Sequence, residues 1–360
     1  MPLRIALLLS LLALPALAQS KSSDNDGRLK KALQRYPEAD TNKDGVLTFQ
    51  EARAYLQKIQ TGNGTSVPSA KKTQRSNDPQ IKPNFADLSY GSHPNDKLDL
   101  WCVKSDKSTP LVVFIHGGGF IGGDKSSASG LILKQCLDSG VSFAAINYRF
   151  RTEASINVVL RDCARAVQFL RYKAGEYNLD KTRIACYGGS AGAGTSLWLA
   201  FHPDLADPQN PDPVLRESTR ILAAGANATQ ATYDILRWAE VVGEDAVKKY
   251  SDEADYAAFY GLKSPADLQS DEGKMLRADA DMLGLISKDD PPVYLASGDT
   301  HDKLQNRGDY LHSPLHAQTV KKYCDQFGVP CIFAKGADKS HGSMTDFLLE
   351  HLGAKTSTGQ

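Results

Sequence analysis

The 360-residue sequence lacks an excess of either charge, because 42 Lys and Arg residues balance 42 Asp and Glu residues. Nucleic acids select basic surfaces, so this balance disfavours nucleic-acid binding. The sequence also has no Cys-x-x-Cys pair, which argues against a zinc or thiol-redox motif. With 41% hydrophobic and 23% charged residues, the chain is nevertheless able to bury a large core. Wholesale disorder is therefore excluded.

The first 18 residues differ from the rest, because they contain a single charge, Arg4, followed by an apolar stretch from Ile5 to Leu17. The stretch runs into Ala16-Leu17-Ala18, which supplies the small residues of a signal-peptide cleavage site. This stretch is shorter than the roughly 20 residues that span a bilayer, and no later run approaches that length. The sequence therefore predicts a signal peptide over residues 1–18, cleavage before Gln19, and a secreted or periplasmic protein without a membrane anchor.

An oxidising compartment would permit disulfide bonds among the cysteines. Six cysteines admit 15 full pairings, so the pairing does not follow from the sequence. For Cys163 and Cys186 the simpler interpretation is a small buried side chain. The six residues are Cys102, Cys136, Cys163, Cys186, Cys324 and Cys331.

The sequence beyond residue 18 divides into three parts. Residues 24–60 show two helical patterns separated by an acidic loop, which predicts a helix-loop-helix module. Residues 61–83 are rich in Gly, Pro, Ser, Asn and Lys and are typical of a linker. Residues 84–355 alternate short apolar runs with helical patterns. This alternation predicts an α/β domain with a mostly parallel sheet and helices on both faces.

Six short apolar runs in the large domain are typical of buried parallel strands. They cover residues 111–115, 141–146, 184–187, 221–224, 293–296 and 331–334. Between the second and third runs, apolar residues from Val159 to Ala174 recur on one face of a predicted amphipathic helix.

The acidic loop of the small module, residues 40–51, matches the 12-residue EF-hand calcium loop. Gly45 supplies the sharp turn, and oxygen atoms stand at the ligand positions of a hard cation. No second such loop is present, so we expect weak Ca²⁺ binding with a structural role; the alternative is a solvated acidic turn. The predicted ligands are Asp40, Asn42, Asp44, the carbonyl of Val46, Thr48 and Glu51.

A glycine run, Gly117-Gly118-Gly119, follows His116 directly after the predicted strand 111–115. Consecutive glycines let backbone N–H groups turn inward, which is what an oxyanion hole requires. A phosphate-binding loop is disfavoured, because no Gly-Lys-Ser/Thr follows at the spacing of a P-loop.

A second glycine motif, Gly188-Gly189-Ser190-Ala191-Gly192, lies between a predicted strand and a predicted helix. This is the context of a nucleophile elbow, in which flanking glycines relieve crowding around a strained serine. The motif predicts Ser190 as a nucleophile and places the N–H of Ala191 in the oxyanion hole. A tight connection without chemistry is the alternative interpretation.

A serine nucleophile needs a histidine base, and the base in this order of elements follows the last strand. His341 lies in the polar loop after the predicted strand 331–334 and is the predicted base. His301, His312 and His316 compete but precede that strand, whereas His351 lies deep in the final helix. The sequence thus favours His341.

A carboxylate should orient the base, and it is expected shortly after the predicted strand 293–296. Asp299 is the first choice, because it follows that strand most closely. Asp302 and Asp309 remain alternatives within the same long loop. The predicted triad is therefore Ser190, Asp299 and His341, with the acid left open among three residues.

These motifs, together with Asn147-Tyr148-Arg149, resemble those of the α/β-hydrolase superfamily. Within it, the chain is similar to the hormone-sensitive-lipase-like carboxylesterases and to related secreted polysaccharide esterases. The resemblance implies an α/β-hydrolase fold over roughly residues 84–352. It also implies that Gly118 and Gly119 join Ala191 in donating the oxyanion hydrogen bonds.

The resemblance and the triad together predict a serine ester hydrolase that works through an acyl-enzyme without a catalytic cofactor. Short acyl or aryl esters, including esters linked to polysaccharide, are the expected substrates. The alternative is an inactive hydrolase-fold binding protein with a calcium-dependent interaction module. Aromatic residues between positions 204 and 290 would either cap the pocket or pack against the core; they are Tyr233, Trp238, Tyr250, Tyr256, Phe259 and Tyr260.

Overall fold

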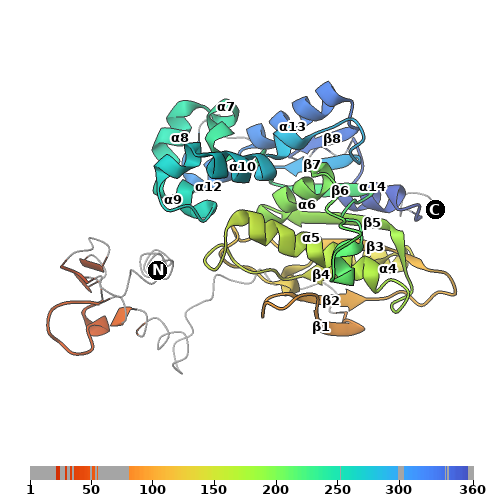
Figure 1. Ribbon diagram of the computed structural model, residues 1–360, viewed down its shortest axis with the longest axis horizontal. Coiled ribbons are helices and arrows are strands. Elements are labelled where there is room, and N and C mark those ends of the chain that lie inside the picture. Colours follow the sequence, from red (N-terminus) through yellow and green to blue (C-terminus); the bar gives the residue numbers. More distant parts are fainter. Residues whose placement is uncertain are drawn as a thin grey trace. The chain divides into compact units, whose positions relative to one another are not determined.

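The computed structural model describes residues 22–24, 29–30, 33–34, 36–48, 51–52, 55, 81–251, 253–298, 304–336, 338 and 340–355. The chain forms two compact units, residues 1–77 and 78–360 (Figure 1). The predicted signal peptide and nearly all of the predicted linker lie outside the described residues. Two acid candidates, Asp299 and Asp302, lie outside them as well.

The first unit is built around the acidic loop. The short 3₁₀ helix η3, Pro37–Ala39, precedes the loop, and Ser22 pairs with Thr48 in an antiparallel bridge. Helical residues occur on both sides, among them Leu29 before the loop and Ala52 after it, and both are fully buried. The described residues therefore give the unit a small apolar core.

The second unit contains an eight-stranded sheet in the order β1-β2-β4-β3-β5-β6-β7-β8 (Figure 1). Strands β3 to β8 run parallel, while β2 pairs antiparallel with both β1 and β4. The strands are β1 Phe85–Ser89, β2 Lys97–Trp101, β3 Thr109–Ile115, β4 Ser142–Ile146, β5 Leu179–Gly189, β6 Ala223–Asn227, β7 Val293–Ser297 and β8 Cys331–Lys335. The predicted mostly parallel α/β sheet is confirmed.

All six predicted strands are present, and β6 is displaced by about two residues from its predicted start. Strands β1 and β2 were not predicted. In β2, Leu98 and Leu100 alternate with half-buried Lys97 and Asp99. Antiparallel strands near a sheet edge show such alternation, whereas the six predicted runs are apolar throughout.

The two faces of the sheet carry separate cores, because side chains alternate along each strand. In β3, Leu111, Val113 and Ile115 face one core, and Val112 and Phe114 face the other. Helices α5 (Ile156–Tyr172), α6 (Ala191–Phe201) and α13 (Pro314–Phe327) pack on the first face, and α4 (Gly130–Asp138) and α14 (Met344–His351) on the second.

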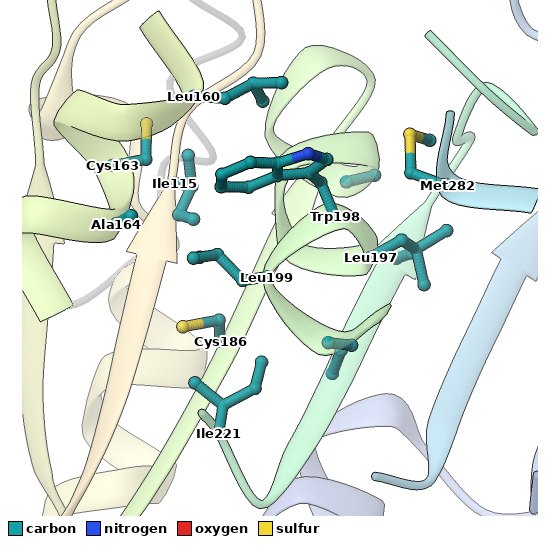
Figure 2. Close-up of a cluster of buried hydrophobic side chains, with 14 of the residues drawn as sticks. Ile115, Leu160, Cys163, Ala164, Cys186, Leu197, Trp198, Leu199, Ile221 and Met282 are labelled. Atoms are coloured by element: carbon teal, nitrogen blue, oxygen red, sulfur yellow. The ribbon is translucent and has the colours of Figure 1, made fainter. Parts of the chain in front are cut away.

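Trp198 of α6 is the largest fully buried side chain in the first core. Figure 2 shows its indole beside Leu160 of α5 and near Met282. Its indole N–H donates to the carbonyl of Asp279 at 2.7 Å, which satisfies the polar atom of a buried ring. Cys163 and Cys186 are buried free thiols in the same core, so the prediction that they serve as small apolar side chains is confirmed.

Short helices separate β6 from β7 and gather with α12 at one end of the unit (Figure 1). They are α7 Trp238–Val242, α8 Glu244–Tyr250, α9 Glu253–Phe259, α10 Asp271–Ala280 and α11 Met282–Leu285, and α12, Arg307–Leu311, follows β7. Tyr233 and Tyr260 are almost fully buried, and the hydroxyl of Tyr260 donates to the Tyr233 carbonyl. Of the two roles predicted for the aromatic residues in this segment, packing fits these two.

Candidate active site

Ser190 lies at a sharp turn between β5 and α6, where its backbone has φ 55° and ψ −119°. Few non-glycine residues adopt this left-handed region, and such strain concentrates at functional sites. A Cβ atom at Gly188 would lie 2.4 Å from the carbonyl oxygen of Ile115, and one at Gly192 would lie 1.9 Å from it. The two glycines therefore allow the turn to pack directly against the end of β3.

The histidine that meets this serine is His312. Its Nε2 atom lies 2.7 Å from Oγ of Ser190, within hydrogen-bond distance. His312 follows the last residue of α12 and is half-buried. Burial lowers the pKa of its imidazole, which keeps the ring neutral and able to accept a proton near neutral pH.

The predicted base, His341, is not brought to Ser190. It lies in the turn before α14, and its side chain is exposed. His312 lies next to Ser190 instead, because Arg307–Leu311 form helix α12 and the end of this helix places that histidine at the elbow. Chain order alone disfavours His312 as the base, because it precedes the last strand.

The acid of the triad is not assigned by the described residues. Asp309 accepts hydrogen bonds from the backbone N–H groups of Gln305 and Asn306, in a capping box that begins α12. In the described part of the chain, no carboxylate hydrogen-bonds to His312. Asp309 therefore caps helix α12, and Asp299 and Asp302 remain the predicted candidates for the triad acid.

The glycine run after β3 adopts backbone angles that favour glycine, with φ 112° at Gly118 and φ 62° at Gly119. A Cβ atom at Gly118 would lie 2.1 Å from the carbonyl oxygen of Gly122. No described residue accepts a hydrogen bond from the backbone N–H of Gly118, Gly119 or Ala191. These donors are therefore free for a developing oxyanion.

His116 holds the glycine run in place through its buried ring. Its ring is fully buried, stacks on Tyr148 with 4.2 Å between ring centroids, and places Nδ1 2.7 Å from the carbonyl oxygen of Gly117. The hydroxyl of Tyr148 donates to the carbonyl of His116 at 2.7 Å. Burial lowers the pKa of His116, so the ring is a neutral positioning group.

A cavity of about 540 Å³ opens at the carboxyl ends of β6, β7 and β8. Asn227 lines it, and the carbonyl of Asn227 accepts the backbone N–H of Ser190 at 2.9 Å. Asp338 and Gly342, which lie on either side of His341 in the sequence, line it as well. Ligands of open α/β sheets bind at this carboxyl edge of the strands.

In the acidic loop, residues 40–51, the described carboxylates accept hydrogen bonds from other residues of the loop. The carboxylate of Asp40 accepts the N–H of Gly45 at 2.9 Å, and Glu51 accepts the hydroxyl of Thr48 at 2.7 Å. Oxygen ligands of this kind suit Ca²⁺. Among the residues that the structure describes, however, no three His, Cys, Asp or Glu side chains are grouped closely enough to hold a metal ion. Calcium binding stays a prediction.

A strained serine between a strand and a helix, opposite a glycine-rich loop after β3, is the architecture of the serine carboxylesterases with the α/β-hydrolase fold. The comparison with known families agrees with this class. The chain belongs to the BD-FAE family, whose model matches residues 98–313, more than half of the chain. The match begins beyond the acidic loop and says nothing of it.

The chain is also similar to individual proteins. It is 25% identical over 255 residues to a probable isoprenylcysteine alpha-carbonyl methylesterase of Arabidopsis thaliana, covering 63% of this chain and 51% of that protein. The chain thus spans about half the length of this curated relative, and less of the next ones.

Two solved structures share the fold. A truncated carbohydrate esterase from gut microbiota has a TM-score of 0.58 and 21% identity over 75% of this chain and 96% of that one. The acetyl ester-xyloside bifunctional hydrolase of Caldicellulosiruptor lactoaceticus has a TM-score of 0.53 and 20% identity over 72% of this chain and 88% of that one. Among the residues described, no helix is both long and apolar enough to cross a membrane.

Proposed function

We propose that this protein hydrolyses carboxylic esters through an acyl-enzyme formed on Ser190. The observation that carries the proposal is the 2.7 Å contact between Oγ of Ser190 and Nε2 of His312 at a strained turn. The N–H groups of Ala191, Gly118 and Gly119 have no acceptor among the described residues. A nucleophile, a base within reach and oxyanion donors are the three parts that acyl transfer needs.

In the proposed reaction, His312 takes the hydroxyl proton as Ser190 attacks the ester carbonyl carbon. The negative charge that develops on the carbonyl oxygen is held by the N–H groups of Gly118, Gly119 and Ala191. The alcohol leaves with the proton from the imidazolium. Water then attacks the acyl carbon while His312 takes its proton, the bond to Oγ breaks, the carboxylic acid leaves, and His312 returns the proton to Ser190.

His341 remains the alternative base, because it follows the last strand as the order of a hydrolase triad requires. Its loop also lines the cavity beside the elbow. His312 is preferred because a general base must first be within hydrogen-bond reach of its proton. Asp299 is kept as the proposed acid, with Asp302 as its competitor, and measuring Asp299→Asn beside Asp302→Asn decides between them.

The substrate class that we propose is an ester carried by a carbohydrate. The BD-FAE family membership and the printed descriptions of two similar structures, a carbohydrate esterase and an acetyl ester-xyloside hydrolase, support it. The signal-peptide pattern in residues 1–18 is consistent with it, because export would bring the enzyme to polysaccharides outside the cell.

The experiment is hydrolysis of 4-nitrophenyl acetate by the wild-type protein and by Ser190→Ala. We expect the variant to lose activity by several orders of magnitude, since the acyl-enzyme no longer forms. Ser105→Ala is a matched control, because Ser105 is exposed and lies before β3, at the amino end of the parallel strands, whereas Ser190 lies at the carboxyl end of β5. Equal, negligible turnover by wild type and Ser190→Ala would refute the proposed hydrolase activity and favour a binding protein.

We also propose that residues 40–51 bind Ca²⁺ with a structural role. The support is the match at each ligand position and the turn at Gly45, where φ is 83°. Isothermal titration with Ca²⁺ should show one binding event that Asp40→Ala abolishes and that Asp24→Ala, at an exposed position outside the loop, retains. No heat of binding at millimolar Ca²⁺ would refute this proposal.

A further inference from the structure

Arg151 is a half-buried arginine close to the glycine run 117–119, which we call the oxyanion loop. Its backbone N–H donates to the carbonyl of Phe120 at 2.7 Å, and Phe120 directly follows Gly119. Phe120 is itself held at φ 62° with its ring almost fully buried. The position of Arg151 is therefore tied to the loop that supplies the oxyanion donors.

The guanidinium of Arg151 has no hydrogen bond or ion pair with any residue that the structure describes. This is unlike its neighbour Arg149, whose Nε lies 2.5 Å from Asp162. The adjacent carboxylate, Glu153, faces away, since it accepts the N–H of Phe150 and lies 3.6 Å from His93. A partly buried cation without a partner loses hydration that nothing in the protein replaces.

Two charged groups reach Arg151 electrostatically, Asp255 of α9 and Arg307 of α12, and burial with Arg307 lowers the pKa of Arg151. Asp255 and Arg307 already face each other at 3.5 Å. Arg151 and these two described residues carry two positive charges and one negative charge, a net charge of +1 for the three side chains. Such a charge favours an anion.

Helix α12 links this charged group to Ser190. Arg307 is the first residue of α12, and His312, which contacts Ser190, directly follows its last. Five residues of helix span about 7.5 Å along its axis. The backbone of Arg151 is thus tied to the oxyanion loop, and Arg307 begins the helix whose end places His312 at Ser190.

We propose that Arg151 binds a carboxylate of the substrate, and that the preferred esters are therefore acylated uronic acid units of an acidic polysaccharide. A guanidinium fork matches a carboxylate with two parallel hydrogen bonds. This inference rests on the proposed ester hydrolase function and names the chemistry of its carbohydrate. Arg151 is a specificity-determining residue in this proposal.

The test compares deacetylation of O-acetylated methyl glucuronoside with that of the equally acetylated methyl glucoside, which lacks the charge. We expect the wild-type protein to favour the glucuronoside in kcat/KM, and Arg151→Gln to lower this preference about tenfold or more, chiefly through KM. Arg151→Lys should keep part of the preference, because it retains the charge but not the fork. Arg216→Gln is the matched control, since Arg216 is exposed and bonds only to backbone carbonyls of residues 210 and 211.

An equal rate on the two sugars, or an Arg151→Gln preference equal to that of wild type in a variant that melts at the wild-type temperature, overturns the inference. Hydrolysis of 4-nitrophenyl acetate that depends on Ser190 would still support the proposed function in that case. As a measurement independent of turnover, Ser190→Ala should bind methyl glucuronoside more tightly than methyl glucoside, and Ser190→Ala with Arg151→Gln should not. Equal binding of the two sugars by Ser190→Ala also counts against the inference.

Discussion

Oγ of Ser190 lies 2.7 Å from Nε2 of His312, although 122 residues separate them in the chain. The contact joins the elbow after β5 to the end of α12. It brings together a strained serine and a neutral imidazole, the pair that we propose as nucleophile and base.

The first prediction separates the two histidines. His312→Ala should reduce kcat on 4-nitrophenyl acetate by about 10³-fold or more, because Ser190 loses its base, whereas His341→Ala should retain most of the activity. Since burial lowers the pKa of His312, wild-type activity should persist below pH 6.5 before falling on the acid side. The reverse result, loss in His341→Ala alone, would assign the base to His341.

The second prediction concerns the packing of the elbow on β3. A Cβ atom at Gly192 would lie 1.9 Å from the Ile115 carbonyl oxygen and 2.8 Å from that of His116, and both contacts are to backbone. Gly192→Ala should therefore cost about 1–3 kcal/mol or more and displace the oxyanion loop, which lowers kcat. Gly175→Ala is the control, because nothing lies within 4 Å of its Cβ position. Thermal melts and kinetics on both variants check this; wild-type behaviour of Gly192→Ala would contradict it.

The third prediction tests how the glycine run is held. Tyr148→Phe removes the hydroxyl that donates to the His116 carbonyl but keeps the stacked ring. A buried carbonyl left without its donor costs about 1–3 kcal/mol, and we expect kcat to fall with little change in KM. Tyr172→Phe, at a side chain that is 45% exposed, should change neither stability nor kcat. If Tyr148→Phe lowered the melting temperature without altering kcat, the bond would be structural only.

The fourth prediction follows from His316, which burial holds at a pKa of about 4. Nδ1 accepts the N–H of Ala231 at 3.2 Å, and Nε2 lies 3.1 Å from the Tyr310 carbonyl oxygen, so the neutral ring satisfies both partners. The unfolded chain binds a proton near pH 6.5 and the folded chain does not. Stability should therefore be complete above pH 6.5 and decline by about 3 kcal/mol as the pH falls towards 4.

Urea unfolding between pH 4.5 and 7.5 measures this decline. The comparison with His316→Gln isolates the contribution of one residue, because other histidines, His116 and His312 among them, also titrate below their usual range. The slope of stability against pH should be smaller in the variant. An unchanged slope would show that His316 does not set it.

Much of the fold was predictable because its signals are local. A buried parallel strand such as β3 is a short apolar run, and the glycines around Ser190 mark a turn that only small residues permit. Strand β2, next to the edge strand β1, escaped prediction because its polar and apolar residues alternate, which is a weaker signal in a single sequence. The sequence likewise points to Ser190, Gly118, Gly119 and Ala191 without any knowledge of distant contacts.

The base and the neighbourhood of Arg151 were not predictable in this way. Which histidine reaches Ser190 depends on helix α12. Asp309 forms the capping box at the start of this helix, and His312 contacts Ser190 at its end. Nothing in the sequence distinguishes Arg149, paired with Asp162, from Arg151, which has no partner in the described part of the chain. The sequence by itself determined the six parallel strands, the elbow and the glycine run after β3, because these depend on neighbouring residues. The tertiary structure decided the partners of Ser190 and Arg151, because those contacts join segments far apart in the chain.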